Sequence, residues 1–210
     1  MSVRLVAAVL ALFAPMLAGA QSLYNEGQHY RVINPPVPTQ AADGKVEVGE
    51  VFSYACVHCA NFEPFVTAWK KSLPDHVEYQ GMPAVFNPTW EALARSHHAL
   101  AQLGALERLH PLMFKAIHQD RKPLSNLDAV ADFLATQGVD RDDFLAAAKS
   151  AEMDERLQRE RARAMGFGIE GTPSMVVNGK YLVSAGAAGG FQGMLQVVDF
   201  LVSQEASAPR

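Results

Sequence analysis

The chain has 210 residues, of which 49% are hydrophobic and 19% are charged, and its formal net charge at pH 7 is −4. A chain of this length can bury a complete hydrophobic core, so it needs no disulfide or metal staple to fold. The small acidic excess argues against nucleic acid as a partner, because nucleic acid selects basic surfaces.

The first twenty residues have the pattern of a secretory signal peptide. Arg4 precedes an apolar run over residues 5–17, and Ala18-Gly19-Ala20 matches the small-x-small site of a signal peptidase. The alternative is a transmembrane anchor, but the run is shorter than the ~20 residues that a membrane-spanning helix needs. We therefore predict a cleaved signal peptide over residues 1–20, an exported chain and no stable membrane insertion.

The segment that follows is expected to be an extended arm and then a strand. Residues 30–38 contain three prolines within four positions, which favours an extended arm over a helix. Residues 45–54 are rich in valine and aromatic side chains, which is typical of a strand. This strand runs directly into a pair of cysteines.

A helix and a second strand are expected after the cysteines. Apolar residues recur every three or four positions from residue 56, which predicts an amphipathic helix that Leu73-Pro74 closes. Pro64 should kink this helix or make its first turn irregular. Residues 76–82 then return to a strand-like composition.

The middle of the chain predicts a block of helices. Alanine, leucine and charged residues dominate from residue 87 to about 165, with helix starts at Asn87-Pro88, Ser125-Asn126 and Asp140 and stops at Gly104 and Gly138. A hairpin over residues 173–184 and an amphipathic helix over residues 190–204 follow. The order of elements indicates an α/β layered core that a helical insertion interrupts.

The chain carries only two cysteines, Cys56 and Cys59. An exported chain meets an oxidising compartment in which disulfides form and persist. A bridge that closes so short a loop stabilises by roughly 2 kcal/mol, against ~4.7 kcal/mol for a loop of a hundred residues. The pair is therefore better suited to redox chemistry than to stapling the fold.

The position of the two cysteines suggests different roles for them. Cys56 is expected where a strand gives way to a helix, and the free backbone N–H groups and the dipole there stabilise a thiolate nucleophile. Cys59 lies one helical turn further on and should be the more buried, resolving thiol. His58 can stabilise the thiolate and so make the disulfide more oxidising; the alternative is an exposed residue without a role.

Two cysteines at this spacing also occur in zinc sites, which usually have four ligands. Here the remaining ligands are missing from the pattern, because the other candidates, His97-His98, His110 and His118, are scattered through the helical block. We therefore expect no structural metal and no cofactor. Transient binding of a soft metal by the dithiol stays open.

Two segments carry a specific resemblance to a known family. Residues 50–63 read EVFSYACVHCANFE, and residues 171–181 read GTPSMVVNGKY. With these motifs the chain resembles the DsbA family of periplasmic thiol:disulfide oxidoreductases over nearly its whole mature length. The resemblance implies a thioredoxin fold with an inserted all-helical domain. The expected division is a signal peptide (1–20), a first thioredoxin segment with the N-terminal arm (21–86), the helical insertion (87–162) and a second thioredoxin segment (163–210).

The resemblance also assigns site residues. Pro173 matches the cis-proline that faces the disulfide, and the backbone of Thr172 would pair with an extended client strand. Glu50 matches a buried acid that accepts a proton from Cys59, although an ordinary carboxylate at a strand edge is the alternative. Glu63 matches another acidic position of the family, or is simply a solvated helix residue.

The chain departs from the family pattern next to the sulfurs. Pro-His is the commonest pair between the two cysteines, whereas this chain has Val57-His58, and it has Thr172 where valine is common. We expect both departures to tune the reduction potential and the choice of client. The family also has an apolar client groove, for which the candidates are Met82, Phe86 and Met175, each of which could instead belong to the core.

The function predicted by the resemblance is that of a periplasmic dithiol oxidase. It would pass the Cys56–Cys59 disulfide to secreted proteins with free thiols through a mixed disulfide at Cys56. A DsbB-type, quinone-linked membrane partner would reoxidise it, and the chain would act as a monomer. The alternatives are a disulfide reductase or isomerase, for which the arm over residues 21–39 looks too small to dimerise, and a soft-metal-binding thioredoxin-fold module without turnover.

Overall fold

A computed structural model describes residues 22–207, so the expected signal peptide lies outside the described residues. Within residues 22–207 no helix has the length and the apolar character needed to cross a membrane. The strands of this region are β1 (Arg31–Val32), β2 (Val46–Phe52), β3 (Val77–Pro83), β4 (Ser174–Val177) and β5 (Tyr181–Ser184). The helices are α1 (Val57–Lys70), α2 (Pro88–Gln102), α3 (Leu106–His118), α4 (Leu127–Ala135), α5 (Arg141–Ala148), α6 (Ala151–Phe167) and α7 (Phe191–Ser207).

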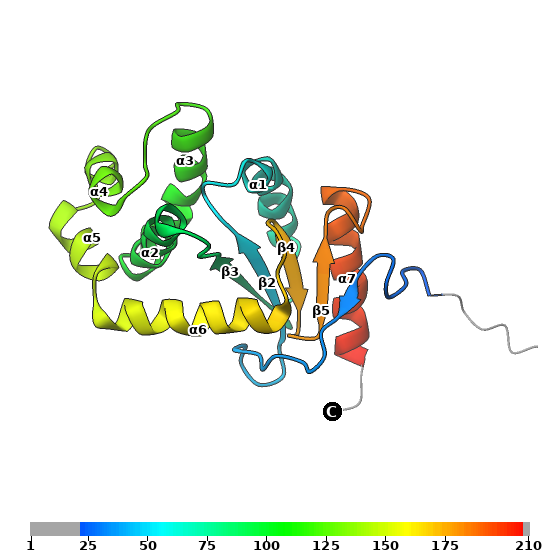
Figure 1. Cartoon of the computed structure of the whole chain (residues 1–210). Helices are drawn as coiled ribbons and strands as arrows, with labels where there is room; N and C mark the ends of the chain where they lie inside the picture. The colour runs from blue at the N-terminus through cyan, green and yellow to red at the C-terminus, as the bar shows by residue number, and fades with distance from the viewer. Residues whose placement is uncertain (1–21, 208–210) are drawn as a thin grey trace, which may run out of the picture.

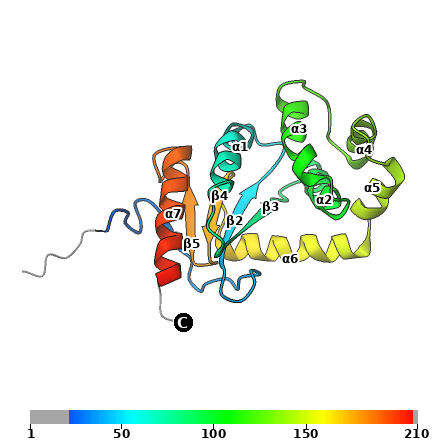
Figure 2. The ribbon, with the colours of Figure 1, turned by 180° about the vertical axis from the view of Figure 1, so that it is seen from behind.

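The strands form one mixed sheet in the order β1-β5-β4-β2-β3. Only β2 and β3 are parallel; every other neighbouring pair is antiparallel. Helices α1 and α7 cover one face of the sheet, where their side chains share a core with Val48 and Val177 (Figure 2). The end of α6 covers the other face, where Phe167 packs with Val51 and Val176.

Helices α2 to α5 stand beside the sheet, and α6 runs back from them to the strands (Figure 1). The expected helix starts are confirmed, because the side chains of Asn87, Asn126 and Asp140 accept hydrogen bonds from the first turns of α2, α4 and α5. The start of α3 was not predicted, because Ala105 offers no capping side chain. The α/β core with a helical insertion is therefore present.

Helix α6 joins the helical insertion to the sheet without a break. It continues to Phe167, so the expected domain boundary between residues 162 and 163 falls inside it. From its last turns, Arg163 makes a buried ion pair with Glu47 of β2. Glu47 also accepts a hydrogen bond of 2.6 Å from the backbone of Gln40. One buried carboxylate thus binds β2, the N-terminal arm and α6 together.

Helix α1 begins directly after Cys56 and runs through Pro64 to Lys70. Its apolar side is that expected from the sequence, with Phe62, Val66 and Trp69 buried. The predicted hairpin is also present, since β4 and β5 are joined by a turn with a hydrogen bond of 2.9 Å from Lys180 N to Val177 O.

The N-terminal arm belongs to the sheet, which the sequence did not predict. Residues Arg31–Val32 pair with β5, and Val37 N donates a hydrogen bond of 3.0 Å to the carbonyl oxygen of Gly179. Gly179 has φ +65°, and a Cβ there would lie 1.9 Å from the carbonyl oxygen of Val37. The arm can therefore dock only on a hairpin with glycine at this position.

Gly179 and Gly104 offer a matched test of this docking. Both have nearly the same left-handed φ (65° and 66°), but a Cβ at Gly104 meets nothing within 4 Å. We expect Gly104→Ala to lower the free energy of unfolding by about 1 kcal/mol, the cost of the left-handed backbone. Gly179→Ala should cost about 3 kcal/mol or more, because the arm must also move. Urea unfolding measures both, and equal costs would contradict the close contact.

Candidate active site around Cys56 and Cys59

The two cysteines lie at the start of α1, where β2 leads into the helix. Cys56 is the N-cap residue, with φ −87° and ψ 117°, and its carbonyl oxygen accepts a hydrogen bond of 3.1 Å from Ala60 N. Its own N–H is held by the carbonyl oxygen of Ser53 at 3.0 Å. Both thiols are free, Cys56 partly exposed and Cys59 completely buried. This is the reduced form of the pair.

The environment separates the acidities of the two thiols. A hydrogen bond from the Cys59 thiol is the main cause that lowers the pKa of Cys56 to about 5. Burial opposes this shift, while the Thr172 side chain and the backbone N–H groups of Cys59 and His58 reinforce it. The hydrogen bond to Cys56 and burial together raise the pKa of Cys59. At neutral pH Cys56 is therefore a thiolate and Cys59 a thiol.

The loop before β4 faces Cys56. The Thr172–Pro173 peptide bond is cis, and the carbonyl oxygen of Thr172 lies 3.4 Å from Cys56 Sγ. Pro173 is buried, whereas the residues between the cysteines point outward, with Val57 52% exposed and His58 exposed. The structure thus brings the two segments of the sequence motif together at the sulfur of Cys56.

Glu50 lies in the central strand β2, buried at 2% exposure, which rules out a solvated carboxylate at a strand edge. It accepts a hydrogen bond from the hydroxyl of Tyr79 on β3. Burial raises the pKa of Glu50, although the hydrogen bond from Tyr79 and the charge of His110 oppose the shift. Its carboxyl group can therefore hold a proton at a higher pH than an exposed glutamate.

Glu63 is also buried, at 8% exposure, and is not a solvated helix residue. Its carboxylate accepts hydrogen bonds from Thr67 Oγ1 at 2.6 Å and from His110 Nε2 at 3.1 Å. Burial alone would raise the pKa of Glu63, but the hydrogen bond and charge of His110 and the bond from Thr67 outweigh it and lower the pKa. Glu63 is therefore an anion that orients His110.

A network around Tyr54 was missed by the sequence analysis. Its hydroxyl lies 2.7 Å from His110 Nδ1 and 3.3 Å from His97 Nδ1. The carboxylate of Glu63 accepts from His110 Nε2, so this nitrogen carries a proton, while the other ring nitrogen, Nδ1, faces the Tyr54 hydroxyl. Burial lowers the pKa of His97, so neutral His97 can donate to the same hydroxyl. Helix α3 of the insertion thus holds the residue two positions before Cys56.

The backbone of Tyr54 is held as well. His118 Nε2, at the end of α3, lies 2.8 Å from the carbonyl oxygen of Tyr54. The sequence analysis considered the histidines only as scattered candidates for metal ligands. The signal that could have revealed their shared role is that His110 and His118 lie eight positions apart in one helix. In residues 22–207 no group of three or more histidine, cysteine, aspartate or glutamate side chains is arranged to hold a metal ion.

The three candidate groove residues are placed differently. Met175 is completely buried and belongs to the core. Met82 is also buried, at 3% exposure, but it lines a cavity of about 210 Å³ together with Phe86. Phe86 is 54% exposed and stacks on Trp90, with ring centroids 5.1 Å apart. A second groove, of about 480 Å³, opens beside His58 and Pro173.

Comparison with known proteins agrees with this geometry. Residues 67–197 match the family model of the DSBA-like thioredoxin domain. Among curated proteins, thiol:disulfide interchange protein DsbA of Azotobacter vinelandii is 40% identical over 87% of this chain and 85% of its own length. The protein of the same name from Pseudomonas aeruginosa PAO1 is 35% identical over 97% of this chain and 95% of its own length.

Solved structures give the same result for the fold. The oxidoreductase DsbA from Xylella fastidiosa superimposes with a TM-score of 0.83 at 38% identity, covering 89% of this chain and 100% of that chain. Pseudomonas aeruginosa DsbA gives a TM-score of 0.83 at 36% identity, covering 87% of this chain and 94% of that chain. The thioredoxin fold with a helical insertion is confirmed.

The acidity of Cys56 predicts a pH profile. A pKa of about 5, below the ordinary 9.0, means that the thiolate stabilises the folded reduced form fully above about pH 9, less as the pH falls, and no longer below about pH 5. We expect alkylation of Cys56 by iodoacetamide to stay fast through neutral pH and to halve near about pH 5. Cys59→Ala should move this midpoint upward, whereas Cys59→Ser keeps a donor and should move it less. An unchanged midpoint in Cys59→Ala would exclude the hydrogen bond as the main cause.

The hydrogen bond between His118 of α3 and the carbonyl oxygen of Tyr54 predicts a link between the stability of the fold and the pKa of Cys56. His118→Leu leaves the Tyr54 carbonyl without its donor and should lower the free energy of unfolding by about 1–2 kcal/mol. Because the loop before Cys56 loosens, the pKa of Cys56 should rise. His98→Leu is the control, since it breaks a buried pair with Glu160, 2.8 Å apart, that does not touch this loop. If both variants leave the alkylation profile unchanged, His118 serves stability alone.

Proposed function

The chain belongs to the DsbA family of thiol:disulfide interchange proteins, and we propose that it is the dithiol oxidase of this pair of cysteines, working in the periplasm. The predicted thiol:disulfide oxidoreductase activity is confirmed by the family. The observation that carries the direction of the reaction is the difference in acidity between the two thiols. A reduced form that is stabilised as a thiolate makes the corresponding disulfide a strong oxidant.

The first step is attack by a client thiolate on the sulfur of Cys56 in the disulfide. A bond forms between the client sulfur and Cys56 Sγ, the Cys56–Cys59 bond breaks, and its electron pair leaves on Cys59. The exposure of Cys56 and the complete burial of Cys59 support attack at Cys56. Thr172, beside Cys56, would hold the client backbone.

The second step releases the oxidised client. A second client thiolate attacks the client sulfur of the mixed disulfide, and Cys56 leaves as a thiolate. The lowered pKa of Cys56 makes it a good leaving group at neutral pH. The client dithiol has then lost two electrons and two protons. The cysteine pair has gained the two electrons and one proton, on Cys59, and the other proton is released to solvent because Cys56 stays a thiolate.

Protons move through the acids beneath the site. Cys59 leaves as an anion in the first step and must gain a proton, because its raised pKa favours the thiol. Glu50 is suited to give this proton, and to take it back on reoxidation, because burial raises its pKa. Glu63 acts less directly, by fixing His110 and thereby Tyr54.

Three further assignments concern His58 and the two residues that depart from the family pattern, Val57 and Thr172. The backbone N–H of His58 supports the thiolate, and its ring adds a positive charge near the sulfur when protonated. Val57, being exposed beside Cys56, would contact clients. Thr172 supplies a side-chain hydrogen bond to the thiolate that valine would not.

The partners follow from the reaction. The oxidant that restores the disulfide would be a DsbB-type membrane protein linked to quinone, and the clients would be secreted proteins with free thiols. The chain would act as a monomer and be exported by the signal peptide over residues 1–20. A reductase or isomerase would instead need a low reduction potential, with a cysteine pair that is more stable as the disulfide.

The reduction potential of the pair tests the direction of the reaction. We expect it, measured against glutathione buffers, to lie well above about −270 mV, the value of the reducing protein thioredoxin. His58→Ala keeps the backbone N–H but removes the ring, so the potential should fall some of the way toward that value. A wild-type pair as reducing as thioredoxin would exclude the oxidase and favour a reductase or isomerase.

A further inference from the structure

The groove beside Cys56 has a wall that neither sequence motif contains. Its volume is about 480 Å³, and it is lined on one side by four residues of the N-terminal arm, Gly27, Gln28, Tyr30 and Arg31. Across from them lie His58, from the active site, and Pro173, from the loop before β4. The arm is thus one of the segments that line the groove next to the active site, together with the segment that joins β5 to α7.

Arg31 fastens this wall to the loop that holds Pro173. Its Nη2 donates hydrogen bonds to the carbonyl oxygens of Phe167 at 2.8 Å and Gly168 at 3.0 Å, at the end of α6. A cation is favourable there, because the last carbonyls of a helix carry partial negative charge. Gly168 has φ +64°, which favours glycine, and a Cβ there would lie 2.9 Å from Arg31 Nη2. The chain reaches Thr172 only four residues later.

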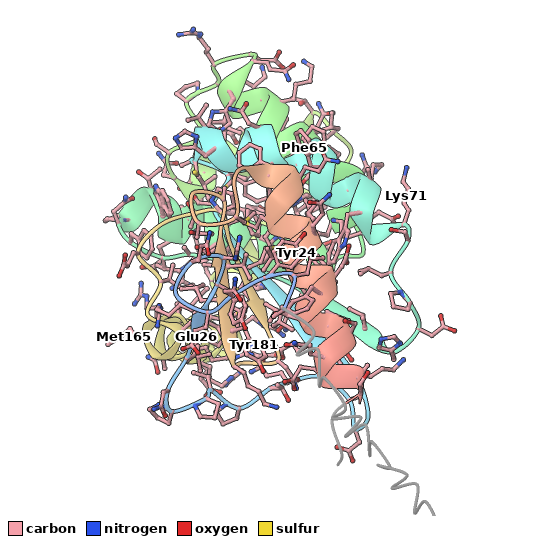
Figure 3. The ribbon with its side chains drawn as sticks, turned by 90° about the vertical axis from the view of Figure 1, so that its right-hand side faces the viewer. Tyr24, Glu26, Phe65, Lys71, Met165 and Tyr181 are labelled. Carbon is pink, nitrogen blue, oxygen red and sulfur yellow. The ribbon has the colours of Figure 1, made fainter. Side chains whose placement is uncertain are left out.

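The wall is also ordered before any client arrives. Gly27 N donates to the carbonyl oxygen of Tyr30 at 2.8 Å, and Asn25 N donates to His29 Nδ1 at 3.0 Å. The ring of Tyr24 meets that of Phe200 on α7 edge-on, with centroids 5.4 Å apart. Figure 3 shows Tyr24 against α7 and Glu26 in the loop of the arm. A wall fixed in this way costs a client little ordering entropy to bind.

We propose that residues 27–31 are a client-binding wall, which contacts the extended polypeptide on one side of the cysteine that forms the mixed disulfide. The proposal rests on the oxidase function and adds a specificity element to it. The occupant is an unfolded client segment, because the groove is continuous with His58 and Pro173 and offers small and apolar surfaces. Cys56 is partly exposed and does not line the groove, so we expect a small dithiol to reach it without touching the arm.

Gln28 gives the sharpest test, because it is exposed and uncharged and lines the groove. We would compare Gln28→Lys and Gln28→Glu in the oxidation of two dithiol peptides that differ only in having lysine or glutamate beside the cysteines. Gln28→Lys should favour the glutamate peptide and Gln28→Glu the lysine peptide, each by about three- to fivefold in kcat/KM. Raised salt should remove both preferences.

The controls separate the wall from the oxidase itself. Dithiothreitol oxidation should be unchanged in both variants, and the same substitutions at Gln204, exposed near the end of α7 and outside the groove, should give no preference. The proposal of a client-binding wall would be overturned if the two Gln28 variants had the same peptide preference. It would also be overturned if the substitutions at Gln204 shifted the preference to the same extent. A wild type that oxidises neither dithiothreitol nor peptide would overturn the oxidase instead.

Discussion

The chemistry of this molecule depends on the hydrogen bond from the thiol of Cys59 to the thiolate of Cys56. It forms only because Cys56 caps α1 and Cys59 lies one turn along the same helix, so both sulfurs share one end of one element. The same bond lowers the pKa of Cys56 and raises the pKa of Cys59, whereas two cysteines without it would have similar pKa values. Tyr54 and the histidines of α3 that contact it hold the segment that leads into that end of α1.

The helical insertion contributes directly to that support. Through His110 and His118, one helix holds both the hydroxyl and the carbonyl oxygen of Tyr54, two residues before Cys56. Glu63, from α1 itself, orients His110 and so closes a loop of contacts between α1, α3 and the end of β2. The insertion is therefore a component of the active-site scaffold, in addition to covering one side of it.

The sequence predicted the features of this structure that are local. The cap residues of α2, α4 and α5, the Asn178-Gly179 turn and the Cys motif are read from a few adjacent positions, and they were right. Contacts between distant segments were not readable: the docking of the arm on β5, the histidines around Tyr54 and the burial of Met82 each depend on how elements pack. The isomer of Pro173 came from family resemblance alone.

The buried pair between Arg163 and Glu47 has a consequence for how the molecule comes apart. Removing the insertion together with the whole of α6 would leave the carboxylate of Glu47, 2% exposed, without its cation Arg163, and an unpaired buried charge is costly by several kcal/mol. The thioredoxin portion is thus not a free-standing module from which the added helices could be removed. Sheet and insertion should melt in a single cooperative transition, so the enzyme survives or is lost to proteolysis as a whole.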